Sequence, residues 1–358
     1  MITEELTRNE LRDIGTDVEK AAELASLVYT TDTMKGIQRV RKGKNFTYLL
    51  SDKEVNDEKQ LARIRKLAIP PAWEEVWICK LHNGHLQATG KDSKNRKQYR
   101  YHEQWNELRN QTKFHRLLEF GKQLPALRLK LEEDISLPGL NEDKVIATVI
   151  SLMERTYIRI GNQEYEKMNG SYGLSTLKDK HVKIEGHTIR FSFTGKKGIS
   201  HDISLKNRKL ASIVKACQEI PGRELFQYYD DDGNKKAIDS GKVNTYIKNI
   251  TGGDFTTKDF RTWAGTLQII RSLNSMEEAI SIAEKKKKVI AALDEVSVKL
   301  GNTRTVCKNY YVHPGIIRLY EEDKLNDYIE QLDDIEKPDQ ISGLTNEEKV
   351  LMKILKKI

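Results

Sequence analysis

The spacing of hydrophobic residues changes along the first hundred residues of the chain. Residues 1–30 carry Leu, Ile, Val and Ala at near-helical spacing, which predicts a helix. Between residues 37 and 102 this pattern gives way to short runs of alternating apolar and polar residues, and Asn83-Gly84 is typical of a hairpin turn. The strand-like runs are residues 46–50, 76–79 and 85–89. This region therefore predicts a small N-terminal domain that is rich in sheet.

A long helical pattern follows this first domain. It covers residues 101–129, after which the acidic run at 132–134 and Pro138-Gly139 indicate a boundary or an exposed turn. We expect an α+β protein with two domains, one at residues 1–110 and a larger, mainly helical one at residues 111–358.

The larger domain is predicted to begin with a helix and to contain three short strands. Asn141 is a good N-cap with acidic residues after it, and apolar residues recur on one face as far as Met153, so we expect a helix that ends at Gly161-Asn162. Beyond residue 206 the spacing is mostly helical, apart from a loop at 230–234. The predicted strands are residues 181–184, 188–193 and 199–203.

Charge restricts the possible partners of this chain. Of its 358 residues 38% are hydrophobic and 32% are charged, and the formal net charge is +8. An excess of basic residues favours a polyanionic partner, nucleic acid ahead of an anionic membrane. The N-terminus lacks the pattern of a signal peptide and no run of 18 apolar residues occurs, so we expect a cytoplasmic or nucleoid-associated protein.

The cysteines predict neither a disulfide framework nor a metal site. Cys79, Cys217 and Cys307 are odd in number and far apart, which is typical of reduced thiols. Cys79, His82 and His85 are regularly spaced but lack a fourth ligand, so ordinary hairpin residues are a better interpretation than a zinc site.

Four residues that lie far apart in the sequence suit attack on a phosphodiester without a metal. Arg159 and Arg261 can stabilise the charge that grows on the non-bridging oxygens, because guanidinium groups match that geometry and stay charged. Lys196, between glycines in a predicted hairpin turn, can protonate a leaving oxygen if its pKa is lowered, and Tyr311 can be a covalent nucleophile. Taken singly, each also has an ordinary interpretation as a solvated side chain.

These residues and the sequence blocks around them resemble type IB DNA topoisomerases of the short, bacterial and poxvirus-like kind. The resemblance covers roughly residues 35–320, and its blocks are Ile69-Pro70-Pro71-Ala72-Trp73, Gly90-Lys91, Lys97–His102, Tyr157–Asn162, Gly195-Lys196, Lys258–Thr262 and the segment around Tyr311. It implies the catalytic fold shared by tyrosine recombinases and these topoisomerases. It also implies relaxation of supercoiled double-stranded DNA through a 3′-phosphotyrosyl intermediate, without ATP, a metal ion or an obligate protein partner, and a monomer.

The resemblance further implies roles for individual residues. Arg159 and Arg261 correspond to the arginines that clamp the phosphate. Lys196 corresponds to the general acid, with Lys197 as the alternative in the same motif, and Lys258 to a lysine that aids proton transfer.

Two neighbouring tyrosines compete for the role of nucleophile. Tyr311 lies directly before Val312-His313-Pro314 and nine residues after Asn302. Each of these two spacings favours Tyr311 over Tyr310 as the nucleophile. Asn302 stands where many relatives carry histidine. Its amide can donate a hydrogen bond to a phosphate oxygen but cannot become cationic.

A basic strip at residues 91–102 is predicted to contact DNA. In an alternating strand Tyr99 and Tyr101 share one face, so cations could meet phosphates while the rings reach a groove. The strip could instead be a solvated edge strand whose lysines prevent aggregation. Tyr165 corresponds to a tyrosine that contacts the DNA backbone near the cut. The cations of the strip are Lys91, Lys94, Arg96, Lys97 and Arg100.

Two other functions are compatible with the same residues. A tyrosine recombinase shares the catalytic set, although Lys258 stands where recombinases commonly have histidine, and residues 69–102 look like the topoisomerase cap. A DNA-binding architectural protein would lack one or more catalytic groups, and none is missing.

Overall fold

The computed structural model describes residues 17–43, 45–93, 95–230, 232–277, 279, 281–329 and 343–358. The chain divides into two compact units, Met1–Arg116 and Leu117–Ile358. The division lies inside the 33-residue helix α4 (Glu103–Ile135), and so does the boundary that the sequence predicts after residue 110. Within the described part of the predicted N-terminal helix, α2 covers Val18–Leu24 and is capped by the Asp17 side chain; residues 1–16 lie outside the described residues.

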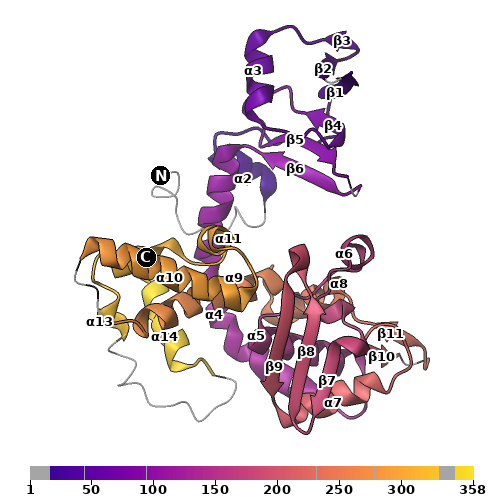
Figure 1. Ribbon diagram of the computed structural model, residues 1–358, viewed down its shortest axis with the longest axis vertical. Helices are drawn as coiled ribbons and strands as arrows, with labels where there is room; N and C mark the ends of the chain where they lie inside the picture. The colour runs from indigo at the N-terminus through magenta and orange to yellow at the C-terminus, as the bar shows by residue number, and fades with distance from the viewer. Residues whose placement is uncertain are drawn as a thin grey trace. The chain divides into compact units, whose positions relative to one another are not determined.

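The N-terminal unit is built on a six-stranded antiparallel sheet with the order β3-β2-β1-β4-β5-β6 (Figure 1). Helix α3 (Glu58–Lys66) places Ile64 in a core with Ile37, Val76, Ile78 and Ala88 of the sheet. The expected sheet-rich domain is therefore confirmed. Its strands are β1 (Ile37–Lys42), β2 (Asn45–Leu50), β3 (Lys53–Glu54), β4 (Glu74–Ile78), β5 (Leu86–Lys91) and β6 (Lys97–Tyr101).

The C-terminal unit contains the predicted three-stranded sheet, in the order β7-β8-β9. Its strands are β7 (Val182–Glu185), β8 (Thr188–Thr194) and β9 (Ser200–Lys206). The turn between β8 and β9 is a short 3₁₀ segment, η3 (Lys196–Gly198), so Lys196 lies at a hairpin tip as expected. The alternation of buried and exposed residues along β8 follows the period of two that the sequence predicts.

Helices form most of the remainder of this unit, which confirms the α+β organisation with a mainly helical second domain. They are α5 (Glu142–Thr156), α6 (Gln163–Asn169), α7 (Arg208–Gln218), α8 (Ser240–Thr251), α9 (Thr257–Asn274), α10 (Ile282–Leu300), α11 (Arg304–Tyr310), α12 (Pro314–Glu321), α13 (Asn326–Ile329) and α14 (Asn346–Leu355), with 3₁₀ turns η1 (Leu174–Thr176) and η2 (Asp179–His181).

The structure differs from the local predictions at three places. Helix α5 does not reach Gly161-Asn162: it ends at Thr156, because Tyr157 adopts a left-handed conformation (φ 58°) and donates its N–H to the Met153 carbonyl. The loop at 230–234 joins two short strands that were not predicted, β10 (Gln227–Tyr229) and β11 (Lys235–Ala237). The acidic run 132–134 belongs to α4 and is not a turn.

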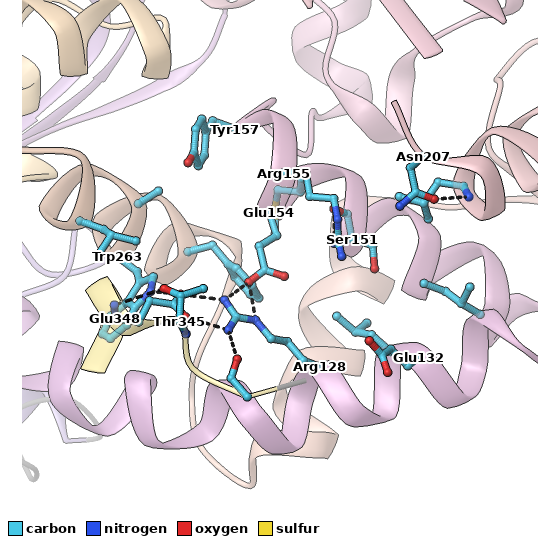
Figure 2. Close-up of a pocket in the computed structure, with 18 of the residues that line it drawn as sticks. Arg128, Glu132, Ser151, Glu154, Arg155, Tyr157, Asn207, Trp263, Thr345 and Glu348 are labelled. Atoms are coloured by element: carbon cyan, nitrogen blue, oxygen red, sulfur yellow. Dashed lines mark hydrogen bonds and ion pairs between the residues drawn. The ribbon is translucent and has the colours of Figure 1, made fainter. Parts of the chain in front are cut away.

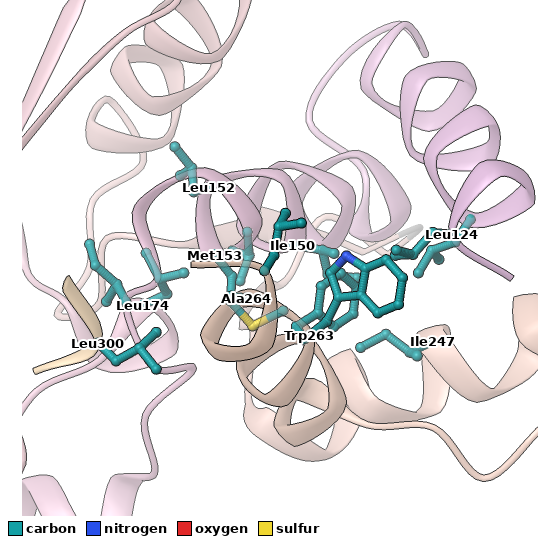
Figure 3. Packing of buried hydrophobic residues seen from close by; sticks show 14 of the residues in the cluster. Leu124, Ile150, Leu152, Met153, Leu174, Ile247, Trp263, Ala264 and Leu300 are labelled. Atoms are coloured by element: carbon teal, nitrogen blue, oxygen red, sulfur yellow. The ribbon is translucent and has the colours of Figure 1, made fainter. Parts of the chain in front are cut away.

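Helix α9 lies at the centre of the core of the C-terminal unit. From Phe260 to Ile270 every residue of it is buried. Figure 3 shows Trp263 and Ala264 of α9 among Ile150 and Met153 of α5 and Leu124 of α4. A helix enclosed on all sides has little freedom to shift, so the residues near its N-terminus are held rigidly.

A partly buried ionic network connects α4, α5, α9 and α14 (Figure 2). The Arg128 guanidinium donates to Glu154 at 2.6 and 2.8 Å and to Glu348 at 2.7 and 2.9 Å. Trp263 Nε1 donates to the same Glu348 carboxylate at 3.0 Å. The network borders a cavity of about 630 Å³ between these helices. It attaches the C-terminal helix to the helix that carries Arg261.

Replacing Glu348 with alanine is expected to lower the free energy of unfolding by about 3 kcal/mol, because Arg128 would remain buried with only one carboxylate partner. Burial raises the pKa of Glu348, but hydrogen bonds and the charge of Arg128 outweigh it, so the net pKa lies below the ordinary value. A carboxylate with a lowered folded-state pKa stabilises the fold at neutral pH, and that contribution is lost as the pH falls through the folded-state pKa. Urea unfolding at pH 7 and at acidic pH measures both effects.

Glu347 provides a matched control on the same helix. It pairs with Arg271, but its side chain is 36% exposed, so Glu347→Ala should cost no more than about 1 kcal/mol. Equal losses for the two variants would show that the Arg128 network does not hold α14.

Candidate active site

Arg159 lies in the segment that follows α5. The left-handed Tyr157 ends the helix, and the Arg159 side chain reaches the turn after α10. Its Nη2 donates to the Gly301 carbonyl at 3.0 Å and to Asn302 Oδ1 at 2.5 Å. Arg159 and Asn302, both predicted to bind the phosphate, are therefore in direct contact.

Arg261 lies in the second turn of α9 and is only 6% exposed. The helix begins with a capping box in which Thr256 and Asp259 satisfy the first N–H groups. Arg261 Nη1 donates to the Tyr157 carbonyl and Nη2 to the Leu300 carbonyl, both at 2.6 Å. One guanidinium thus joins the segments that carry Arg159 and Asn302.

Tyr311 follows directly after α11 and faces Arg261, whose Cζ lies 5.2 Å from the centre of the tyrosine ring. Tyr311 is half-buried, whereas Tyr310 is 47% exposed. Thr266 of α9 donates its hydroxyl to the Tyr311 carbonyl at 3.3 Å. Gly265 permits this close approach, since a methyl group there would lie 2.5 Å from the Tyr311 carbonyl oxygen.

The cluster of Arg159, Arg261, Asn302 and Tyr311 carries positive charge that no carboxylate among the described residues neutralises. Among the described residues neither arginine forms an ion pair; their partners are carbonyls, an amide and a tyrosine. Burial, followed by the nearby Arg261, lowers the pKa of Arg159 to about 10, and burial lowers the pKa of Arg261. Arg159 stays protonated at neutral pH, so the arrangement suits an anion.

The two lysines predicted to take part in proton transfer, Lys196 and Lys258, are on the surface. Lys196 is exposed on the η3 turn, and its Nζ lies 5.4 Å from the ring centre of Tyr165, which is 38% exposed on α6. Lys197 has a left-handed backbone (φ 65°). Lys258 is exposed in the first turn of α9, three residues before Arg261.

In the N-terminal unit the basic strip lies on β5, the edge strand β6 and the loop between them. Tyr99 and Tyr101 share one face, as predicted, and their rings stack at 5.9 Å. They are 47% and 39% exposed. The cations have partners within the chain: Lys91 pairs with Glu75 at 2.6 Å, Lys97 with Asp32 at 2.5 Å, and Arg100 donates to the Ala68 carbonyl at 3.0 Å. Lys94 lies outside the described residues.

The cysteine–histidine group near this strip has a packing role. Cys79 and His85 are buried. The His85 ring stacks on Tyr29 at 4.8 Å and meets Trp105 edge-on at 4.7 Å, while its Nδ1 accepts from the Thr30 N–H. Across the described ranges, no group of three or more His, Cys, Asp or Glu side chains could hold a metal ion.

Sequence reasoning missed two residues beside the cluster, Gly265 and His201. A glycine inside a buried helix is a recognisable sign of close packing, so Gly265 could have been found. His201 has no such sign in the sequence, because its neighbours come from distant segments.

Comparison with known proteins agrees with this arrangement. Residues 95–338 match the family model described as eukaryotic DNA topoisomerase I, catalytic core, and residues 45–92 match bacterial DNA topoisomerase IB, N-terminal domain. The chain is 36% identical to DNA topoisomerase 1B of Acanthamoeba polyphaga mimivirus, over 80% of this chain and 88% of that protein. It is 24% identical to DNA topoisomerase 1B of Vaccinia virus (strain Copenhagen), over 72% and 79% of the two chains.

The fold and the comparisons define an isomerase that acts on DNA topology. The chain belongs to the type IB DNA topoisomerase family. The resemblance seen in the sequence is thereby confirmed, and the recombinase and the architectural protein are the weaker alternatives. In the part of the chain that the structure describes, no helix is long and apolar enough to cross a membrane.

Proposed function

We propose that Tyr311 is the nucleophile of a DNA strand-cleavage reaction at this site. Its phenolic oxygen forms a bond to phosphorus while the bond to the 5′ oxygen breaks, leaving a 3′-phosphotyrosyl link and a free 5′ end. The phenolic proton passes to water. The single observation that carries the proposal is the position of the Tyr311 ring beside Arg261, in a cluster whose two arginines lack a carboxylate partner among the described residues.

Arg159, Arg261 and Asn302 are proposed to stabilise the phosphorane transition state, whose negative charge exceeds that of the substrate. Arg159 donates to the Asn302 side chain and to the Gly301 carbonyl, and Arg261 donates to the Leu300 carbonyl. These bonds hold the three groups in place before DNA binds. Lys196 is proposed to protonate the departing 5′ oxygen, and Lys258 to aid that proton transfer. The 5′-hydroxyl then reverses the reaction after the strand has rotated, and the covalent link conserves the energy of the bond, so ATP is not required.

The test of this function is relaxation of supercoiled plasmid by the purified chain in EDTA and without ATP. Relaxed products together with a covalent protein–DNA adduct are expected. Absence of relaxation under these conditions by a folded, DNA-binding preparation would reject the proposal. Strand exchange between two defined sites would instead favour a recombinase.

We infer that double-stranded DNA is the partner and that the chain acts as a monomer, since the proposed catalytic cluster is made entirely from residues of one chain. Sedimentation velocity in the presence of a duplex with a single site tests this, and a complex with two protein copies would contradict it. Association with the nucleoid stays a prediction.

The basic strip is proposed to contact phosphates, and its contribution is measurable from the dependence of affinity on salt. Each phosphate neutralised on duplex DNA contributes a slope of about −0.9 to log K against log salt. Lys97→Ala with Arg100→Ala should flatten that slope by roughly one unit for each phosphate that is no longer neutralised. Because Lys97 pairs with Asp32, Asp32→Asn is the matched control and should free the lysine and steepen the slope. An unchanged slope in the double variant would favour the solvated edge strand.

A further inference from the structure

His201 is the second residue of β9 and stands opposite Phe193 of β8. The two rings stack with their centres 4.9 Å apart and their planes at 22°. Phe193 is buried and His201 half-buried. This stacking fixes the imidazole beside the hairpin turn that carries Lys196.

The His201 ring touches the main chain of two turns at once. A methyl group built on Gly195 would lie 2.6 Å from His201 Nε2, and one built on Gly301 would lie 2.6 Å from His201 Cε1. Gly195 directly precedes Lys196, and Gly301 directly precedes Asn302. The imidazole therefore separates the turn that carries Lys196, the proposed acid, from the turn that carries Asn302, the proposed phosphate-binding amide.

Burial, together with the charges that face His201, keeps it from acting as a cation. Burial, followed by the charges of Arg159 and Arg261, lowers the pKa of His201 below its ordinary value, so the ring is neutral at neutral pH. Neither ring nitrogen forms a hydrogen bond with a described residue. The ring therefore acts on the two turns only through its shape and its packing contacts, which a neutral side chain of similar size could supply.

We propose that His201 is a positioning residue that holds the β8–β9 turn, and with it Lys196, at the correct distance from the Gly301-Asn302 turn. The proposal rests on the proposed role of Lys196 as the general acid. Without the ring, the turn could collapse toward Gly301 or move away from it, and Lys196 would no longer reach the leaving oxygen. Misplacement of a catalytic group by about 1 Å can cost on the order of 100-fold in rate.

Single-turnover cleavage of two DNA substrates tests this proposal. One has a normal phosphodiester, and the other has sulfur in place of the 5′ bridging oxygen, so that the leaving group is a thiolate that needs little protonation. His201→Ala should cleave the normal DNA about 10- to 100-fold more slowly than the unmodified protein, yet cleave the sulfur substrate at nearly its rate. His201→Gln, an uncharged planar side chain of similar reach, should keep most of the activity on both.

The outcomes separate this proposal from the role of Lys196. If Lys196→Ala is not rescued by the sulfur substrate, the acid is wrongly assigned and the His201 proposal fails with it. If Lys196→Ala is rescued and His201→Ala is equally slow on both substrates, only the His201 proposal fails. It also fails if His201→Ala cleaves normal DNA at the unmodified rate, or if His201→Gln is as slow as His201→Ala.

Gly195 provides an independent check on the contact. Its backbone (φ −93°, ψ −165°) suits any residue, so Gly195→Ala introduces only a methyl group that meets the His201 ring. Gly195→Ala should slow cleavage of normal DNA, and the double variant with His201→Ala should lose less than the two single variants predict together. Additive losses would show that the ring and the turn are not coupled, and would overturn the proposal.

Discussion

Tyr311→Phe is expected to abolish both plasmid relaxation and the covalent protein–DNA adduct, while leaving DNA binding nearly unchanged. The hydroxyl is the only group removed, and without it no phosphotyrosyl bond can form. The ring that lies 5.2 Å from the Arg261 guanidinium stays in place, so the packing of the site should persist. Relaxation assays, denaturing gels for the adduct and a binding titration measure these three properties.

Tyr310→Phe is the matched control, because it removes the same hydroxyl from the neighbouring residue. Tyr310 is 47% exposed and ends α11, whereas Tyr311 is held against α9 through Thr266 and Gly265. We expect the Tyr310 variant to remain active. Recovery of a DNA-linked peptide modified at Tyr310 would mean that the register is wrong.

Lys196→Ala is expected to slow cleavage of normal DNA by roughly 10²- to 10⁴-fold, the range typical of general acid catalysis. The same variant should cleave a substrate with a 5′ bridging sulfur at close to the unmodified rate, because a thiolate leaves without a proton. Lys196 lies beside the Tyr165 ring on an exposed turn, so its replacement should not alter stability appreciably. Single-turnover cleavage rates on both substrates measure the effect.

Lys197→Ala is the control within the same turn. Lys197 has a left-handed backbone and is not the proposed acid, so its loss should affect binding more than chemistry. Equal slowing of Lys196→Ala on both substrates would remove this lysine from the role of acid. If the sulfur substrate instead restores cleavage by Lys197→Ala, the acid is Lys197.

Patterns of short range were sufficient to predict the elements that position the site. Alternation predicted the strands of the β7-β8-β9 sheet and several strands of the N-terminal sheet, though not β1 or β3, and the glycines around Lys196 predicted the hairpin tip. Where local and tertiary signals competed, the local interpretation was wrong. Gly161-Asn162 has the composition of a helix stop, but α5 ends earlier, at Thr156. The next residue, Tyr157, is left-handed, and its carbonyl accepts from Arg261.

The sequence by itself determined the family and the order of the chemical groups along the chain, because these depend on residue type and spacing. It is also the source of the prediction that Tyr311, and not Tyr310, is the nucleophile. Only the tertiary structure decided which of these groups meet. Arg159 contacts Asn302 across 143 residues, and Arg261 binds carbonyls 104 and 39 residues away. Likewise, no local sequence pattern predicts the pairing of Lys97 with Asp32 or the position of the His201 ring between two turns. Such contacts arise when distant segments pack together, and packing depends on the complete core, which periodicity within one segment does not encode.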